Sequence, residues 1–168
     1  MARLVLSDAS PLIGLARVDG LSWLRDLFGS VAVTPEVLAE VFCEPEVSDL
    51  SRIRQVLAEK WLRPLDLTPT EPAYPHLGDG ETSCLRVALA RAEPTLLLLD
   101  DRLARREARR AGLQIIGVAA IIGMAEQRQL IPSARVVFDA LLQTDFRIGV
   151  EVIQSVLDSL AATRGTVR

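Results

Sequence analysis

The chain has 168 residues, a formal net charge of −3 and 49% hydrophobic residues, which suits one soluble domain with a sizeable core. The acidic balance excludes a protein that coats nucleic acid through overall positive charge, but it leaves room for a local basic face. The longest non-polar run, residues 115–125, is shorter than the ~20 residues of a membrane span, so no membrane association is expected. Cys43 and Cys84 are too few for a disulfide framework or a zinc site, and both are expected to be reduced core residues in the cytoplasm.

Short apolar runs alternate with helical patterns along most of the chain. In order we expect a strand at 4–6, helices at 9–18 and 21–28, a strand at 31–33, helices at 35–44 and 48–60, a strand at 61–65, a loop at 68–77, a helix at 78–92, a strand at 96–99, a helix at 102–111, a strand at 113–116, and helices at 117–129, 132–143 and 149–161. Such alternation is typical of an α/β fold with a mostly parallel sheet and helices on both faces. One domain is expected over residues 1–162, with residues 163–168 as a tail.

Several helix starts carry recognisable capping residues. Ser10 is predicted to cap the first helix with Pro11 at its first position, and Thr34 and Pro35 repeat this pattern. Asp79 is the predicted cap of the helix near residue 80. The proline in the predicted strand 61–65 indicates a strand at the edge of the sheet.

Residues 96–99 are four consecutive leucines, and Asp100 and Asp101 follow them directly. Such an apolar run indicates a strand that is buried on both faces. Open parallel sheets bind ligands beyond the carboxyl ends of their strands. The two aspartates therefore place negative charge at the edge of the sheet where such folds usually have their functional site. One of the two aspartates could instead serve only as a cap for the following helix.

Three further acids are candidates for the same edge. Asp8 follows the first strand, Glu40 follows the second strand by about two helical turns, and Glu81 lies on the inward face of a helix. Each has a simpler reading: Asp8 as a cap, Glu40 as a solvated residue, and Glu81 as a charge opposing the helix dipole. If they meet, their repulsion calls for a hard divalent cation such as Mg²⁺ or Mn²⁺.

The helix after the aspartate pair is rich in arginine. Arginines stand at 102, 105, 106, 109 and 110, and their spacing places most of them on one face. They could form an ordinary solvated face. The sharper hypothesis is contact with a nucleic-acid backbone beside the acids, made by Arg102, Arg105, Arg106 and Arg109.

Other chemistries fit the sequence poorly. His76 is the only histidine and lies in a proline-rich loop, which argues against a histidine-based triad. Residues 78–81 lack the Lys-Ser/Thr ending of a phosphate-binding glycine loop. A phosphoacceptor domain would need a lysine after a late strand, but the only lysine, Lys60, comes before the leucine run.

Taken together, these segments resemble the PIN-domain family. The resemblance rests on residues 4–13, 35–41, 78–81 and 97–102, with further support from 112–117 and 146–148. Their order and spacing resemble a prokaryotic PIN subgroup long catalogued only as a domain of unknown function. The likeness covers nearly the whole chain.

The resemblance implies a three-layer α/β/α sandwich and a metal-dependent endoribonuclease of the kind that serves as toxin in VapC-type toxin–antitoxin pairs. The implied catalytic residues are Asp8, Glu40, Glu81 and Asp101, and the implied metal ligands are Asp8, Glu81, Asp100 and Asp101. Ser10 matches a small residue that supports the first acid. Leu99 stands where many members have threonine, an alignment that favours Asp101 over Asp100 as the ligand.

The implied partners are an RNA substrate, a cognate antitoxin protein and a second copy of the chain in a homodimer. Two alternatives stay open. One is a degenerate PIN domain that binds protein or nucleic acid without catalysis, and the other is a PIN nuclease with no toxin role.

Overall fold

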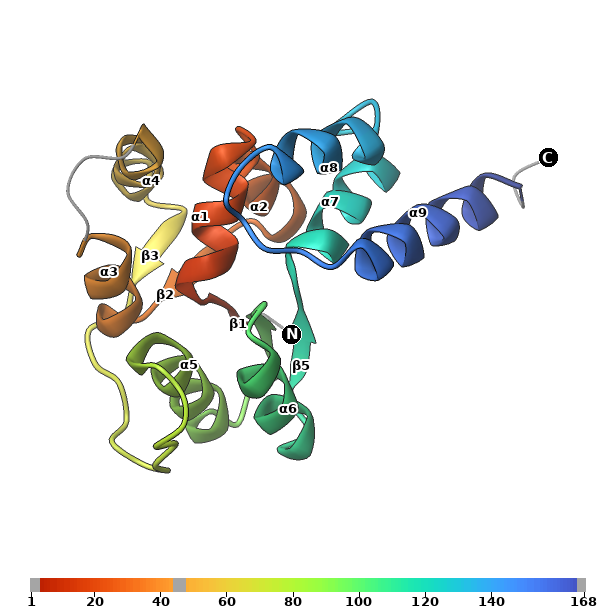
Figure 1. Ribbon diagram of the computed structural model, residues 1–168. Helices are drawn as coiled ribbons and strands as arrows, with labels where there is room; N and C mark the ends of the chain where they lie inside the picture. Colours follow the sequence, from red (N-terminus) through yellow and green to blue (C-terminus); the bar gives the residue numbers. More distant parts are fainter. Residues whose placement is uncertain (1–3, 44–47, 166–168) are drawn as a thin grey trace.

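A computed structural model describes residues 4–43 and 48–165 of the chain. Its centre is a sheet of five strands in which every neighbouring pair is parallel (Figure 1). The strands are β1 (Leu4–Ser7), β2 (Val31–Val33), β3 (Leu62–Pro64), β4 (Thr95–Leu98) and β5 (Gln114–Ile116). The predicted strands are therefore confirmed, with ends that shift by at most one residue.

The order of strands across the sheet is β3-β2-β1-β4-β5. Along the chain, β2 and then β3 add to one side of β1, and the chain then crosses over so that β4 lies on the other side of β1. The predicted edge position of the proline-containing strand β3 is confirmed, since proline has no amide to donate to a further strand. The reversal between β1 and β4 is a topological switch point, where open α/β sheets bind their ligands.

Helices cover both faces of this sheet. They are α1 (Ala9–Arg17), α2 (Leu21–Phe28), α3 (Pro35–Val41), α4 (Ser48–Ala58), α5 (Asp79–Ala90), α6 (Arg102–Arg110), α7 (Val118–Gln127), α8 (Ala134–Leu142) and α9 (Val150–Gly165). Helices α5 and α6 lie on one side, and α1, α2 and α7 lie on the other, with α8 and α9 packed on α7 (Figure 1). The expected α/β/α sandwich is confirmed. No helix in the described part of the chain has the length and hydropathy needed to cross a membrane.

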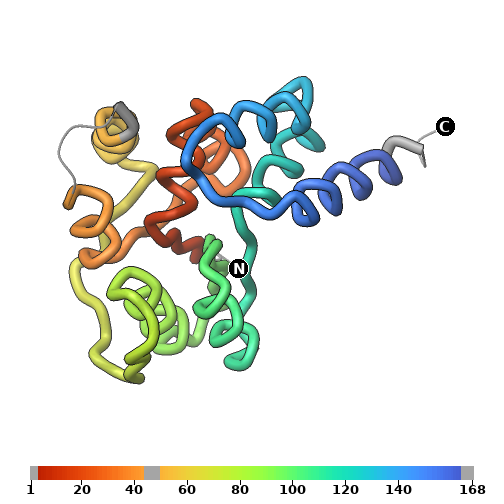
Figure 2. Tube along the Cα trace, in the orientation of Figure 1, coloured from red at the N-terminus to blue at the C-terminus, as the bar shows by residue number. Residues whose placement is uncertain are grey.

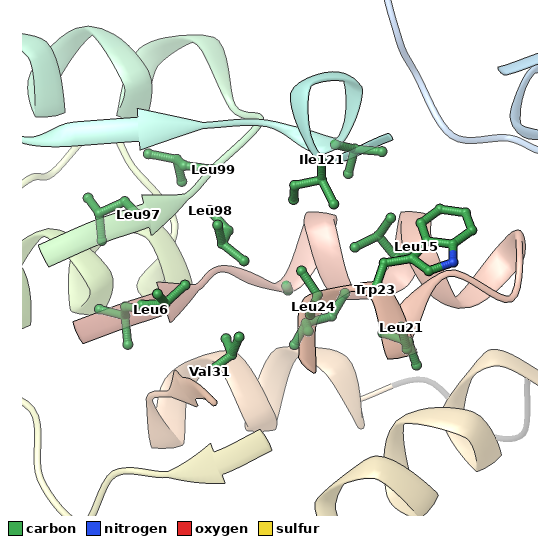
Figure 3. Packing of buried hydrophobic residues seen from close by; sticks show 14 of the residues in the cluster. Leu6, Leu15, Leu21, Trp23, Leu24, Val31, Leu97, Leu98, Leu99 and Ile121 are labelled. Atoms are coloured by element: carbon green, nitrogen blue, oxygen red, sulfur yellow. The ribbon is translucent and has the colours of Figure 1, made fainter. Parts of the chain in front are cut away.

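Strand β4 supplies the centre of the hydrophobic core. Leu97, Leu98 and the following Leu99 are fully buried, and they share one core with Leu6 of β1 and Ile121 of α7 (Figure 3). Strands of a parallel sheet that are covered on both faces need such continuous apolar runs rather than alternation. The leucine run is therefore structural, and its role for the site is to fix where the following aspartates emerge.

Helix starts agree only in part with the capping prediction. The Thr34 hydroxyl accepts a hydrogen bond from the Val37 amide at 3.1 Å, so the predicted cap of α3 is confirmed. The prediction for Ser10 is wrong: α1 already begins at Ala9, and Asp8 holds the N-cap position. The reason is that β1 continues to residue 7, so the chain turns into the helix without a loop.

Two further predictions need correction. Asp79 is the first residue of α5 rather than its cap, which is Gly78. Cys84 is buried as expected, but Cys43 is exposed. Helix α3 ends at Val41, so Cys43 lies beyond the face of that helix that packs on the core.

Candidate functional site

The carboxyl ends of β1 and β4 lie side by side at the switch point. Ser7 pairs with Leu98 in register, and the Asp8 amide donates a hydrogen bond of 3.0 Å to the Leu98 carbonyl. Asp8 therefore lies beside the end of β4, where Asp100 and Asp101 follow closely along the neighbouring chain. One edge of the sheet, here called the rim, thus carries the first and last of the predicted acids.

Asp8 is a buried carboxylate at this rim. It is 1% exposed, and its Oδ1 atom has no hydrogen-bond partner among the described residues. It holds the N-cap position of α1 without forming a capping hydrogen bond from its side chain. Burial, then the charges of Glu81 and Glu40, raise its pKa to about 8, although the amides of Ala9 and Ser10 act in the opposite direction. The contribution of Ser10 seen here is that of its backbone amide.

Gly80, in the first turn of α5, marks the point where two of the acids approach each other. A methyl group on Gly80 would lie 2.5 Å from Oε2 of Glu40 and 2.9 Å from Oδ1 of Asp8, both too close for a real side chain. The carboxyl groups of Asp8, which follows β1, and of Glu40, which lies on α3, therefore both point toward the backbone of α5. Glycine at this position leaves the space in which they meet.

Glu40 and Glu81 complete this acidic group. Glu40 is exposed as a whole, but its carboxyl group turns toward Gly80. Burial of that group raises the pKa of Glu40, and the charges of Glu81 and Asp79 raise it further. Glu81 is half-buried and acts on both Asp8 and Glu40. The structure therefore brings Asp8, Glu40 and Glu81 together, and we call these three residues the acid cluster.

A shallow cavity of about 460 Å³ opens between α3 and α5 beside the acid cluster. Besides Glu40 and Glu81 it is lined by Glu36 and Asp79. Sequence reasoning gave Asp79 only a capping role, so its contribution to the negative charge of the rim was missed. The signal was present in the sequence, because Asp79 and Glu81 both fall in the first turn of one helix.

A buried chain of hydroxyl groups ties α3 to α5. The Ser83 hydroxyl donates to the Gly80 carbonyl at 2.7 Å, and Thr34 Oγ1 lies 2.6 Å from Ser83 Oγ. Because a hydroxyl carries one proton, Ser83 uses its proton on Gly80 and accepts from Thr34, which itself accepts from the Val37 amide. This chain holds the first turn of α5 against the start of α3 and so positions the acid cluster. Sequence reasoning missed Ser83.

Asp100 and Asp101 have different surroundings. Asp101 caps α6 and accepts a hydrogen bond from the Ala104 amide at 2.8 Å. This confirms the alternative that one of the two aspartates is a cap for the following helix. Both carboxyl oxygens of Asp100 lie 3.2 Å from the Val118 amide at the start of α7. Burial raises the pKa of Asp100 to about 6, opposed by this amide and by Arg105. Which aspartate joins the acid cluster as a ligand stays a prediction.

The arginines of α6 divide between two faces. Arg102, Arg105 and Arg109 line a cavity of about 570 Å³ that also contains Asp100, and the Arg105 guanidinium donates to the Leu99 carbonyl at 2.8 Å. The predicted contact residue Arg106 lies elsewhere, with its Nε atom 3.6 Å from Glu107 Oε1.

Arg110 belongs to the same outer group as Arg106, with Nη1 3.1 Å from Glu107 Oε1. The sequence spacing predicts that most of the arginines share one face, and it does not show that Glu107 pairs with Arg106 and Arg110. Arg147, which follows α8, joins the cavity and was not predicted to belong to the site.

The described residues do not form a ready-made group of three or more His, Cys, Asp or Glu side chains that could hold a metal ion. The acid cluster nevertheless has the chemistry of a cation site. Asp8 Oδ1 is buried without a hydrogen-bond donor, Glu40 Oε2 approaches the same space, and the pKa values of both residues are raised by neighbouring acids. Carboxylate oxygens that lack compensating donors are the kind of ligand that Mg²⁺ and Mn²⁺ prefer.

Comparison with known protein families gives a match over almost the whole chain. The family model described as "DUF3368: PIN domain" covers residues 4–162. The chain belongs to the PIN-domain family. No curated protein matches the chain. PIN domains are generally metal-dependent nucleases, so the chain has a nuclease-type fold, and the rim is its candidate site.

Proposed function

We propose that this PIN domain is an endoribonuclease that depends on Mg²⁺ or Mn²⁺ and hydrolyses RNA phosphodiesters. The observation that carries the proposal is the buried Asp8 carboxyl group, which lies near the charges of Glu81 and Glu40 at the switch point and whose Oδ1 atom has no hydrogen-bond partner among the described residues. A proton or a metal ion must relieve this repulsion.

Asp8 and Glu81, together with Asp100 or Asp101, would hold the metal ion. A bound divalent cation supplies positive charge to the phosphate and the leaving oxygen and lowers the pKa of water. The residues of the chain add two functions of their own. Glu40, whose raised pKa makes it a better proton acceptor, is placed to take a proton from attacking water at Oε2. Arg102, Arg105 and Arg109, on the cavity side of α6, orient the phosphate backbone.

We further propose that the protein is the toxin of a VapC-type pair, acts in the cytoplasm, forms a homodimer and meets a cognate antitoxin. The support is the family resemblance of the ordered motifs, together with a rim that is open to solvent at Glu40. A gene for a small partner protein beside this one, whose product restores growth when the two are co-expressed, is the expected result. Growth that is unaffected by expression of an active nuclease would favour a PIN nuclease with no toxin role.

The central test is cleavage of a labelled RNA by purified protein with Mg²⁺, with Mn²⁺ or with EDTA. Wild type is expected to cleave only with metal, and Asp8→Asn and Glu81→Gln are expected to lose at least about 100-fold in rate, as is usual when a group that stabilises the transition state is removed. Glu93→Gln, an exposed acid outside the site, is the matched control. Equal cleavage by all variants would mean a contaminating nuclease and would overturn the assignment.

Two more variants decide between the aspartates after β4. Asparagine caps helices as well as aspartate does, so Asp101→Asn removes the charge and keeps the α6 cap. Asp100→Asn removes the other charge. Whichever variant loses metal-dependent cleavage identifies the ligand, and comparable activity of both with wild type would contradict a role for the pair.

One observation favours the alternative of a binding module without catalysis. The acids of the described chain are not pre-arranged as a metal site, and Asp101 is already engaged as a helix cap. In that case wild type would bind RNA or a partner protein but release no cleavage product with either metal. Binding without cleavage would therefore replace the nuclease proposal.

A further inference from the structure

The cavity of about 570 Å³ beside Asp100 lies between the inner face of α6, the start of α7, and α9 with the segment that leads into it. Figure 2 shows this segment running back from α8 to reach α9. It is fixed to α1, because the Phe146 ring fills the space next to Gly14, where a methyl group would lie 2.5 Å from the ring. Arg17 of α1 also pairs with Asp145 at 2.5 Å. The cavity wall formed by Arg147 is therefore anchored to the helix that follows Asp8.

One wall of the cavity has an excess of positive charge. Arg102, Arg109 and Arg147 form no ion pair with any described residue, in contrast to Arg106 and Arg110 on the outer face of α6. A wall of unpaired guanidinium groups binds an anion, and phosphate matches their planar, two-pronged geometry.

Arg105 is the fixed member of this wall. It is half-buried, held by the Leu99 carbonyl, and its pKa is lowered by burial and by Arg109. The acids in the lining are Asp100, whose carboxyl group faces the Val118 amide, and the exposed Glu151. Four arginines against two acids leave this wall positive.

The remaining lining is mainly apolar, and we call this part the apolar wall. It consists of Ala119 and Ala120 from α7, Ile148, and Val152 and Val156 from α9. Val152 is 50% exposed in the free protein although it lines the cavity, so a flat apolar group could cover it. A volume of about 570 Å³ falls within the range of pockets for small organic ligands.

We propose that this cavity binds one unpaired nucleotide of the RNA, with its phosphate on the arginine wall and its base against the apolar wall. This inference rests on the proposed nuclease function and adds to it a cavity that binds a nucleotide beside the site. Asp100 lies both at the rim and in the cavity lining, so the bound nucleotide flanks the phosphodiester that the acid cluster acts on. A base in a duplex cannot reach such a cavity without unpairing, so a duplex is disfavoured.

The test measures binding in EDTA, so that no cleavage occurs, with a fluorescent single-stranded RNA of ten nucleotides and a blunt duplex of the same sequence. Arg109→Ala combined with Arg147→Ala is expected to weaken single-strand binding at least about tenfold and to reduce its salt dependence. Arg106→Ala combined with Arg110→Ala, from the outer face of α6, is the matched control and is expected to change binding less than twofold. Equal losses in both pairs would mean diffuse electrostatic attraction and would overturn the proposal.

A scan with one abasic nucleotide at each position of the RNA tests the apolar wall. Wild type is expected to lose affinity mainly at a single position, and Val152→Ser should abolish that loss, because the two changes remove the same contact. Val136→Ser is the control, since Val136 is 64% exposed on α8 and outside the cavity. A flat scan, or a duplex bound as tightly as the single strand, would contradict the proposal.

Cleavage of the same RNA with Mn²⁺ separates the two proposals. If wild type cleaves RNA but the cavity variants behave like their controls, the nuclease function stands and the nucleotide cavity fails. If the cavity variants lose binding but wild type cleaves nothing, the cavity stands and the nuclease function fails.

Discussion

At neutral pH a proton and a metal ion compete for the same carboxyl group in the acid cluster. The pKa of Asp8 is about 8, chiefly because the group is buried and secondly because Glu81 is nearby. The metal-free protein therefore holds a proton on Asp8 over much of the physiological range, and a cation has to displace it. Metal affinity should accordingly rise as the pH rises toward 8.

The same raised pKa affects folding. The unfolded chain releases the Asp8 proton near its ordinary pKa of 3.8, whereas the folded chain keeps it until about pH 8. The folded state thus binds the additional proton between these values, so the contribution of Asp8 to stability is greatest at low pH and is lost as pH rises through 8. Asp8→Asn, which cannot ionise, should unfold at a higher temperature than wild type at pH 9 and show a flatter pH profile.

Thermal unfolding in EDTA between pH 5.5 and 9 measures this difference, and each kcal/mol corresponds to about 2–4 °C for a chain of this size. Asp139→Asn, an exposed acid on α8, is the control and should follow wild type at every pH. A variant at Asp8 that is less stable than wild type at pH 9 would show that the carboxylate is compensated after all.

Individual roles at the site were predictable only where a local rule decides them. The Thr34 cap could be predicted because its partner amide is three residues away. The hydrogen bond between Thr34 and Ser83 spans 49 residues, and no periodicity or spacing in the sequence reveals it. Asp8, Asp100 and Asp101 could be located at strand ends and Glu81 at a helix start. The burial that sets the Asp8 pKa, however, depends on packing from several elements.

At the scale of elements, α3 and α5 act as one unit through the Thr34–Ser83–Gly80 chain of hydroxyl groups. Ser83→Ala removes both of its hydrogen bonds in a fully buried place. We expect a loss of about 1–3 kcal/mol in the free energy of unfolding, the usual cost of an unsatisfied buried polar group. Urea unfolding should show this loss, and RNA cleavage should fall at temperatures where the variant is still folded, since Glu40 and Gly80 are no longer held together.

Ser159→Ala on the exposed side of α9 is the control for this change. It should alter neither stability by more than about 0.5 kcal/mol nor cleavage. If Ser83→Ala is as stable and as active as wild type, the hydroxyl chain does not position the acid cluster.

The order and type of elements could be predicted because strands and helices differ in their hydrophobic period, which a single sequence displays directly. Helix faces were harder. The spacing predicts that most of the five arginines of α6 share one face, but Arg106 and Arg110 pair with Glu107 instead. The other three line a cavity together with Arg147, which lies on a segment distant in the sequence.

At the scale of the whole molecule, β4 holds the two halves of the sheet together. Leu97→Ala would open a cavity in the fully buried core on the face of the sheet that this side chain covers. We expect destabilisation by about 2–5 kcal/mol in urea unfolding, which is a large part of the roughly 5–15 kcal/mol that keeps a typical domain folded.

Leu67→Ala, at a residue that is 85% exposed, is the comparison and should change the free energy of unfolding by less than about 0.5 kcal/mol. Similar effects of the two changes would show that the leucine run is not the centre of the core.

The crossover that places β4 next to β1 also determines when the site can exist during synthesis. β1 lies at the start of the chain, yet its second neighbour, β4, begins at Thr95. Pairs of strands so far apart along the chain form late, because a long loop must close first. A nascent chain that stops before β4 lacks the strand that carries Asp100 and Asp101 to the rim. The rim therefore cannot form until the chain has been made through Asp101 and β4 has paired with β1, which delays any nuclease activity until then.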